Sequence, residues 1–108
     1  MRMLTVAAAQ MGPIQKADSR AAVIARMIAL LDAAKGKGAD LVVYPELALT
    51  TFFPRWYHED RGEADIWFED AMPGPATQVL FDRAREHGIA MSFGYAEKTS
   101  DGHHFNTS

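Results

Sequence analysis

The chain has 108 residues, enough for one small domain or for a piece of a larger one. Hydrophobic residues make up 48% of it and charged residues 23%, a composition typical of soluble globular proteins. The net charge of -3 excludes a basic field for nucleic acid or anionic lipid, and the lack of cysteine excludes disulfides, thiolate metal sites and a cysteine nucleophile within these residues.

The start of the chain predicts a strand rather than a targeting segment. A secretory signal would need a basic start, a longer apolar stretch and a small-residue cleavage site. No apolar run approaches the roughly 20 residues of a membrane helix. We therefore expect a cytoplasmic protein with neither a membrane nor a nucleic acid as partner.

Leu4–Ala9 is a short apolar run, typical of a strand buried on both faces. Asp18 or Ser19 can cap the helix that follows, because either side chain accepts a hydrogen bond from a free N–H of the first turn. The helix carries one apolar stripe at helical spacing. Its members are Val23, Ile24, Met27, Ile28, Leu31 and Ala34.

Gly36 and Gly38 are predicted to end this helix, because glycine accepts the left-handed conformation of a C-terminal cap. Leu41–Tyr44 predicts a second buried strand. A strand, a helix and a strand within about forty residues form a βαβ unit, whose strands are parallel and whose crossover is right-handed. The sequence therefore predicts an α/β fold.

The same order of elements recurs further along the chain. Pro75 suits the first residue of another helix, and Gly88 suits its end. In Ile89–Ala96, bulky residues alternate with small ones, so we expect a third strand whose small face packs closely against another segment. An Asp-Gly pair at 101–102 indicates a hairpin turn before a returning strand over His103–Ser108.

The chain stops within that last predicted strand. Native domains rarely end on a half-built sheet edge, because unpaired backbone groups there promote aggregation. We therefore expect residues 1–108 to be the N-terminal fragment of a single larger domain.

The connection Pro45–Gly74 is long, and loops beyond roughly 12–15 residues are usually functional or disordered. A short helix is expected within it at Glu63–Asp70. The connection holds too many aromatic residues for disorder. They are Phe52, Phe53, Trp56, Tyr57, Trp67 and Phe68.

Glu46 lies two residues after Tyr44, at the carboxyl end of the second predicted strand, where open α/β sheets bind ligands. By position alone its carboxylate could be a general base, a metal ligand or a structural cap that orders the turn. Phe52 and Phe53 follow closely enough to wall a pocket, or they belong to the core. Arg55 could attract a carboxylate substrate, or it lies in solvent.

The remaining polar residues are weaker candidates. Several are of metal-ligand type but lack a recognised spacing, which indicates a charged surface loop and no metal site. They are His58, Glu59, Asp60 and Glu63. His103 and His104 are expected to be exposed hairpin residues, and Asn106 is a candidate brace for the neighbouring loop rather than a catalytic residue.

Tyr44-Pro45-Glu46-Leu47, after an apolar strand, resembles the first catalytic motif of the nitrilase superfamily of carbon–nitrogen hydrolases. Ala8–Pro13 resembles the family's first strand and turn, and Met72–Pro75 matches its next element. The longer run Glu46–Trp56, together with Phe105–Ser108, is similar to one branch, the N-carbamoyl-D-amino acid amidohydrolases. The resemblance covers essentially all of the chain.

The resemblance implies the N-terminal part of an α-β-β-α sandwich and a site made of a glutamate, a lysine and a cysteine. The glutamate falls on Glu46, whereas the lysine and the cysteine belong to parts of the family pattern beyond Ser108. The 108-residue fragment alone should therefore be inactive. No cofactor is implied, and the full-length protein is expected to be a homo-oligomer.

The main hypothesis is hydrolysis of an N-carbamoyl-D-amino acid to the D-amino acid, carbon dioxide and ammonia, with Glu46 as the catalytic residue and Phe52 or Phe53 lining the substrate site. A second hypothesis is another amidase of the superfamily or a ureidopropionase-like enzyme, acting on a small amide or carbamoyl substrate. A third is a non-catalytic small-molecule binding module on the same fold. A cysteine and a lysine in the continuing reading frame would exclude the third hypothesis.

Overall fold

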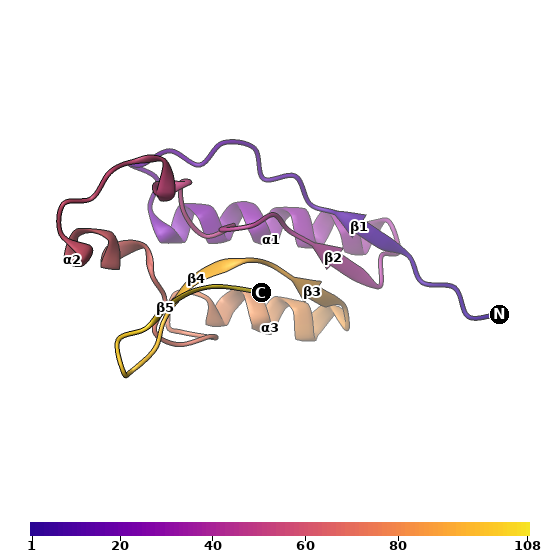
Figure 1. Cartoon of the computed structure of the whole chain (residues 1–108). Coiled ribbons are helices and arrows are strands. Elements are labelled where there is room, and N and C mark those ends of the chain that lie inside the picture. The colour runs from indigo at the N-terminus through magenta and orange to yellow at the C-terminus, as the bar shows by residue number, and fades with distance from the viewer.

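The computed structural model describes all 108 residues and is an α/β structure (Figure 1). Strands β1 (Val6–Ala8), β2 (Leu41–Val43) and β3 (Ala90–Ser92) form one parallel sheet in the order β1-β2-β3. Val6 lies opposite Leu41, and Leu41 lies opposite Ala90. The α/β fold and its parallel βαβ unit are therefore as the sequence predicts.

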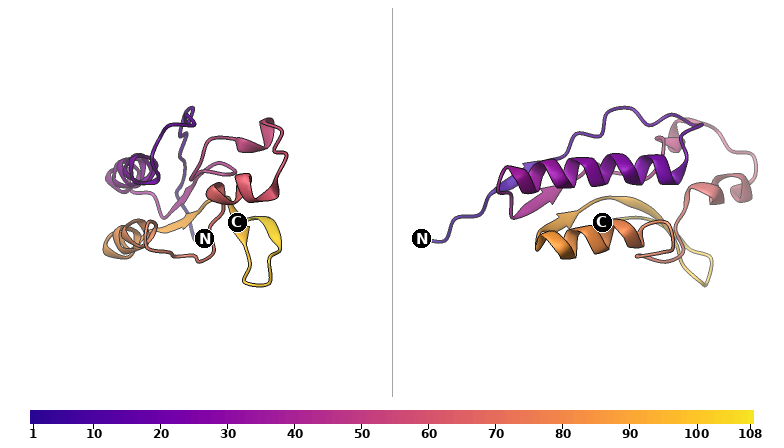
Figure 2. Two further views of the ribbon diagram at one scale, coloured as in Figure 1. Left: turned by 90° about the vertical axis from the view of Figure 1, so that its left-hand side faces the viewer. Right: turned by 180° about the vertical axis from the view of Figure 1, so that it is seen from behind.

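The two long helices, α1 (Arg20–Gly36) and α3 (Gln78–His87), lie side by side on the same face of this sheet (Figure 2). The core is between them and the strands. Side chains with no measurable exposure there include Met27, Leu31, Val42 and Leu80. In the apolar stripe predicted for α1, every residue is buried except Ile28, which packs at the margin of the core.

Both helices cover one face, so the expectation of strands buried on both faces is wrong. Val6 is 53% exposed and Val43 is 40% exposed, because no helix of this chain lies over the opposite face. Val42, which points toward the helices, is fully buried. None of the helices is long and apolar enough to cross a membrane.

The ends of α1 follow the sequence prediction. Ser19 is the N-cap, and its hydroxyl accepts a hydrogen bond from the amide of Ala22 at 3.1 Å. The last residue of α1 is Gly36, and Gly38 takes a φ of 76°, in the left-handed region that glycine tolerates.

The start of α3 differs from the prediction, whereas its end does not. The helix begins at Gln78 rather than at Pro75, because residues 75–77 form a tight turn before it. In that turn the amides of Thr77 and Gln78 both donate to the carbonyl oxygen of Gly74, at 3.1 and 2.9 Å. Gly88 ends the helix with a φ of 63°, as predicted.

The predicted third strand, Ile89–Ala96, is two strands in two sheets. β3 ends at Ser92, and β4 (Tyr95–Lys98) pairs antiparallel with β5 (His104–Thr107). The strand breaks at Gly94 because the backbone there bonds to the turn after β2 instead of continuing the ladder. The hairpin turn between β4 and β5 is where the sequence predicts it, with Gly102 at a φ of 87°.

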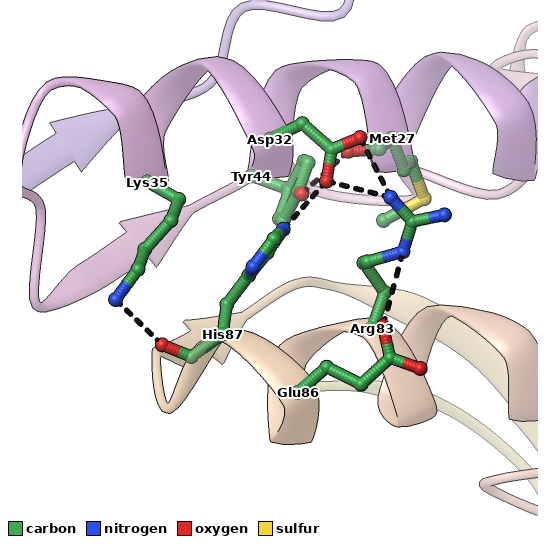
Figure 3. Close-up of polar contacts among 7 residues, drawn as sticks. All are labelled: Met27, Asp32, Lys35, Tyr44, Arg83, Glu86 and His87. Atoms are coloured by element: carbon green, nitrogen blue, oxygen red, sulfur yellow. Dashed lines mark hydrogen bonds and ion pairs between the residues drawn. The ribbon is translucent and has the colours of Figure 1, made fainter.

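An acidic side chain ties the two helices together (Figure 3). Asp32 on α1 accepts a hydrogen bond from Arg83 of α3 at 2.9 Å, and its other oxygen lies 2.7 Å from Nε2 of His87. The hydrogen bond with His87, followed by the charge and hydrogen bonds of Arg83, holds the pKa of Asp32 below its usual range. Lys35 adds a hydrogen bond from its ammonium to the carbonyl oxygen of His87 at 2.7 Å.

The connection between β2 and α3 contains short helices and a second small core. Its helical turns are η1 (Phe53–Arg55), α2 (Arg61–Ala64) and η2 (Asp65–Trp67), so the helix expected at Glu63–Asp70 starts earlier and ends earlier. The small core consists of Leu47, Phe53, Trp67 and Ala96. Within it the rings of Phe53 and Trp67 stack with centroids 6.1 Å apart.

Candidate active site

Glu46 lies in a turn that leaves the carboxyl end of β2, as the sequence predicts. Backbone hydrogen bonds hold this turn against the junction of β3 and β4. The amide of Gly94 donates to the carbonyl oxygen of Pro45 at 3.3 Å, and the carbonyl oxygen of Gly94 accepts from Ala48 at 2.9 Å. The position of Glu46 is therefore fixed by two segments that lie far apart in the sequence.

The residue after Glu46 has a strained backbone. Leu47 has a φ of 48°, in the left-handed region that a residue with a branched side chain rarely occupies. Such a conformation costs roughly 1–3 kcal/mol and persists only where the surroundings enforce it. The buried Leu47 side chain supplies that constraint, because it packs with Phe53, Trp67 and Ala96. The turn thus anchors Leu47 inward and leaves Glu46 exposed.

The carboxylate of Glu46 has one protein partner, Asn106 on β5. Nδ2 of Asn106 donates a hydrogen bond to Oε1 of Glu46, across 60 positions of sequence. The sequence suggested Asn106 as a brace for the neighbouring loop, and the structure shows which atom of that loop it contacts.

Two cavities meet at Glu46. The larger, of about 390 Å³, is lined by Glu46, Phe52 and Phe53, with Asn106 and His104 from β5. The smaller, of about 230 Å³, is lined by residues 11–14 and 45–48 and by side chains of the following loop. Glu46 and Phe52 line both cavities.

The two phenylalanines named from the sequence have different environments. Phe52 is 46% exposed and faces the cavities, whereas Phe53 is 7% exposed and belongs mainly to the small core. Arg55 lines the smaller cavity. Its Nε donates to the carbonyl oxygen of Phe52 at 3.2 Å, and its guanidinium lies 5.5 Å from the ring centroid of Trp56. The roles of all three in substrate binding stay predictions.

A second ion-pair group attaches β5 to the loop that carries these aromatic residues. Lys98 of β4 donates to one carboxylate oxygen of Asp65, and Nε2 of His104 lies 2.8 Å from the other. Lys98, and then His104, hold the pKa of Asp65 below its usual range. The ring of His104 also packs edge-on against Phe68, with centroids 4.6 Å apart. His104 is therefore more than the exposed hairpin residue expected from the sequence.

Arg20, the first residue of α1, contacts the same loop near both of its ends. Its guanidinium donates to the carbonyl oxygens of Leu49 at 3.2 Å and of Ile66 at 3.4 Å. Its Nε lies 2.6 Å from Oε1 of Glu69, in an ion pair whose N–H is not directed at that oxygen. Burial raises the pKa of Glu69, against the opposing effect of the Arg20 charge. No pattern in the sequence indicates this contact.

The residues of metal-ligand type in the loop do not form a cluster. No three His, Asp or Glu side chains of the chain come close enough together to hold a metal ion. Asp60 instead caps α2 by accepting a hydrogen bond from the amide of Gly62 at 2.9 Å, and Nε2 of His58 lies 3.3 Å from the carbonyl oxygen of Phe53. His103 is exposed, as expected, and lies 3.1 Å from Asp101.

A comparison with protein families agrees with this arrangement. The model of the family described as carbon-nitrogen hydrolase matches residues 5–108, which include all the strands and helices as well as Glu46 and Asn106. A match over nearly the whole chain, on an α/β structure, shows the family. The chain belongs to the carbon-nitrogen hydrolase family of the nitrilase superfamily, whose activity is hydrolysis of carbon–nitrogen bonds.

Proposed function

We propose that the protein hydrolyses N-carbamoyl-D-amino acids and that Glu46 is its general base. The observation that carries this proposal is the position of the Glu46 carboxylate. It projects from a strained turn at the carboxyl end of β2, is held by one hydrogen bond from Asn106, and borders two cavities. A residue that only ordered its turn would direct its carboxylate at nearby loop amides, whereas this carboxylate bonds to a side chain 60 positions away.

The proposed chemistry needs a cysteine and a lysine, which the family pattern places beyond Ser108. Glu46 takes the proton of the cysteine thiol as the sulfur attacks the carbamoyl carbon. The bond between the carbamoyl carbon and the amino-acid nitrogen then breaks, and the leaving amine takes that proton from Glu46, which leaves an S-carbamoyl cysteine. Water, deprotonated by Glu46, attacks the carbamoyl carbon, and the departing thiolate takes this proton back from Glu46. The lysine stabilises the oxyanion in both steps, and the released carbamic acid decomposes to carbon dioxide and ammonia.

The position of Arg55 favours a substrate that carries a carboxylate. Its side chain lines the smaller cavity beside Glu46, and its hydrogen bond to Phe52 and its contact with Trp56 hold it there. A guanidinium matches a carboxylate in charge and in geometry. Phe52, which lines both cavities, supplies an apolar surface for the amino-acid side chain.

The proposal extends to the whole protein. Residues 1–108 are the N-terminal part of one carbon–nitrogen hydrolase domain, in a cytoplasmic protein that assembles as a homo-oligomer. The resemblance of Tyr44–Leu47 and of Glu46–Trp56 to the family motifs supports the domain assignment and the assembly.

The experiment is Glu46→Gln in the full-length protein. The amide keeps the size of the side chain and removes the base, so kcat for an N-carbamoyl-D-amino acid should fall on the order of 10²–10⁴-fold with little change in Tm. Glu59→Gln is the matched control, because Glu59 is an exposed carboxylate of the same loop. A stable Glu46→Gln protein with near-normal turnover would contradict the assignment of Glu46 as the general base.

Substrate class is tested separately with Arg55→Met. If Arg55 receives the substrate carboxylate, KM should rise for N-carbamoyl-D-amino acids and stay unchanged for a neutral primary amide. Arg61→Met, an exposed arginine outside the smaller cavity, is the control. Faster hydrolysis of simple amides than of N-carbamoyl-D-amino acids by the unmodified protein would place it in another branch of the family.

A further inference from the structure

One face of β5 is directed at the loop that carries Glu46. Side chains two positions apart in a strand lie on the same face, and His104 and Asn106 have this spacing. Both line the larger cavity with Glu46. The side chains of Phe105 and Thr107 alternate with these two; Phe105 is 51% exposed and also borders the larger cavity, whereas the hydroxyl of Thr107 donates to a carboxylate oxygen of Glu97 at 2.7 Å.

The chemistry of the two groups fixes the direction of the bond between Asn106 and Glu46. An ionised carboxylate can only accept hydrogen bonds, so the amide must turn its nitrogen rather than its oxygen toward Glu46. Nδ2 of Asn106 donates to Oε1. The other oxygen, Oε2, accepts no hydrogen bond from the chain and is left for a substrate, a thiol or a water molecule.

The strand segment that carries Asn106 is held in place at two positions. Asn106 lies opposite Ala96 in the ladder between β4 and β5, and Ala96 is buried in the small core with Leu47. Two residues earlier, His104 is fixed to Asp65. The donor therefore approaches Glu46 from a strand with a set register rather than from a free loop, as pre-organisation of a reacting group requires.

We infer that Asn106 is a positioning residue that holds Oε1 of Glu46 and thereby presents Oε2 as the basic oxygen. This inference rests on the proposed role of Glu46 as general base. It adds that this role depends on a hydrogen bond from Asn106 on β5. Without the amide, the Glu46 side chain can rotate about its own bonds, and a misplacement of about 1 Å can reduce turnover on the order of 10²-fold.

The first test uses Asn106→Ala in the full-length protein. We expect kcat for the preferred substrate to fall on the order of 10²-fold, with KM and Tm nearly unchanged. In a Glu46→Gln background the same change should have little further effect on kcat, because a residue that acts only through Glu46 has nothing left to position. Thr107→Val, on the opposite face of β5, is the control and should leave kcat unchanged.

The second test uses Asn106→Asp, which keeps the shape of the side chain and places a carboxylate against Glu46. Two adjacent carboxylates favour a shared proton, so the acidic limb of the kcat/KM profile should move to higher pH. Because this shift follows from the added charge alone, the positioning role is judged from kcat above the limb. There the ionised aspartate cannot donate a hydrogen bond to Glu46, and kcat should fall, whereas a purely structural role for Asn106 would leave kcat unchanged. If Asn106→Ala is unstable, the near-isosteric aspartate variant still decides the question.

The outcomes separate this inference from the proposed function. If Glu46→Gln lowers kcat as expected but both Asn106 variants keep normal kcat, the positioning role is wrong and the general-base role stands. If Glu46→Gln keeps normal turnover, the proposed function itself fails. Equal losses from Asn106→Ala in the unmodified and Glu46→Gln backgrounds would also contradict an action through Glu46.

Discussion

A Cβ atom at Gly94 would lie 2.9 Å from the Cα of Glu46 and 3.1 Å from the amide nitrogen of Leu47. Both neighbours are backbone atoms of the turn, so neither can rotate away as a flexible side chain would. The junction of β3 and β4 is in direct contact with the candidate base, and this contact requires glycine. It accounts for one of the small residues in the alternation that the sequence shows over Ile89–Ala96.

Gly94→Ala should therefore destabilise the protein by roughly 1–3 kcal/mol, because the added methyl group forces the turn and the strand apart. It should also lower kcat, since Glu46 moves with the turn. Gly36→Ala is the control, because a Cβ there meets nothing within 4 Å. That change lies in α1 and should be neutral or stabilising. Urea unfolding followed by circular dichroism measures both, and equal stability of the Gly94 variant and the wild type would contradict the close contact.

Asp32→Asn should lower Tm at neutral pH but not in acid. The pKa of Asp32 is held below its usual range in the folded state, so the stability that its charge contributes is present above about pH 4 and is lost as the pH falls through the lowered pKa. The difference in Tm between the wild type and the variant should therefore shrink toward zero as the pH falls below about 4. Glu59→Gln, an exposed carboxylate, should show no such pattern. A pH-independent difference for Asp32→Asn would mean that packing, and not charge, links the helices there.

Leu31→Ala should destabilise the protein by about 2–5 kcal/mol, because Leu31 has no exposed surface and its removal leaves a cavity between α1 and the sheet. Ile66→Ala removes a similar side chain that is 68% exposed, and it should change stability little. Chemical unfolding of the two variants gives the comparison. Similar losses of stability in the two variants would contradict a core between α1 and the sheet.

The purified 108-residue chain should not hydrolyse N-carbamoyl amino acids. It contains no cysteine, and the proposed chemistry begins at a thiol. Ammonia release by the chain should equal that of its Glu46→Gln variant. Turnover above this control would require a different nucleophile and would overturn the proposed chemistry.

Features that depend on a few neighbouring residues could be predicted from the sequence. Ser19 caps α1 and Gly88 ends α3, because a cap needs only its own side chain or its own φ angle. The break of the third strand could not be predicted, since Ile89–Ala96 alternates like one strand. It is divided because Gly94 bonds to a turn about fifty positions earlier in the chain, which no local pattern encodes.

In the candidate site, too, local features could be predicted from the sequence and contacts between distant segments could not. Glu46 was found from its place after a strand and from its motif. Its hydrogen bond with Asn106 joins the turn after β2 to a strand of the other sheet, and the ion pair of Arg20 with Glu69 joins a helix to a loop. Pairings of this kind depend on how whole elements pack. The spacing of His104 and Asn106 on one strand face could have indicated that both point the same way, though not toward which partner.

Arg20 gives the molecule a cooperative unit that is discontinuous in sequence. One guanidinium bonds to the carbonyl oxygens of Leu49 and Ile66 and pairs with Glu69, so the first turn of α1 cannot fray without releasing the loop on both sides of its aromatic residues. Amide hydrogens in these three segments should then exchange with solvent at a common rate, slower than the exposed hairpin tip around Asp101. Opening of the region beside Glu46 is, on this view, local unfolding that begins at a helix terminus and not the swing of a single loop.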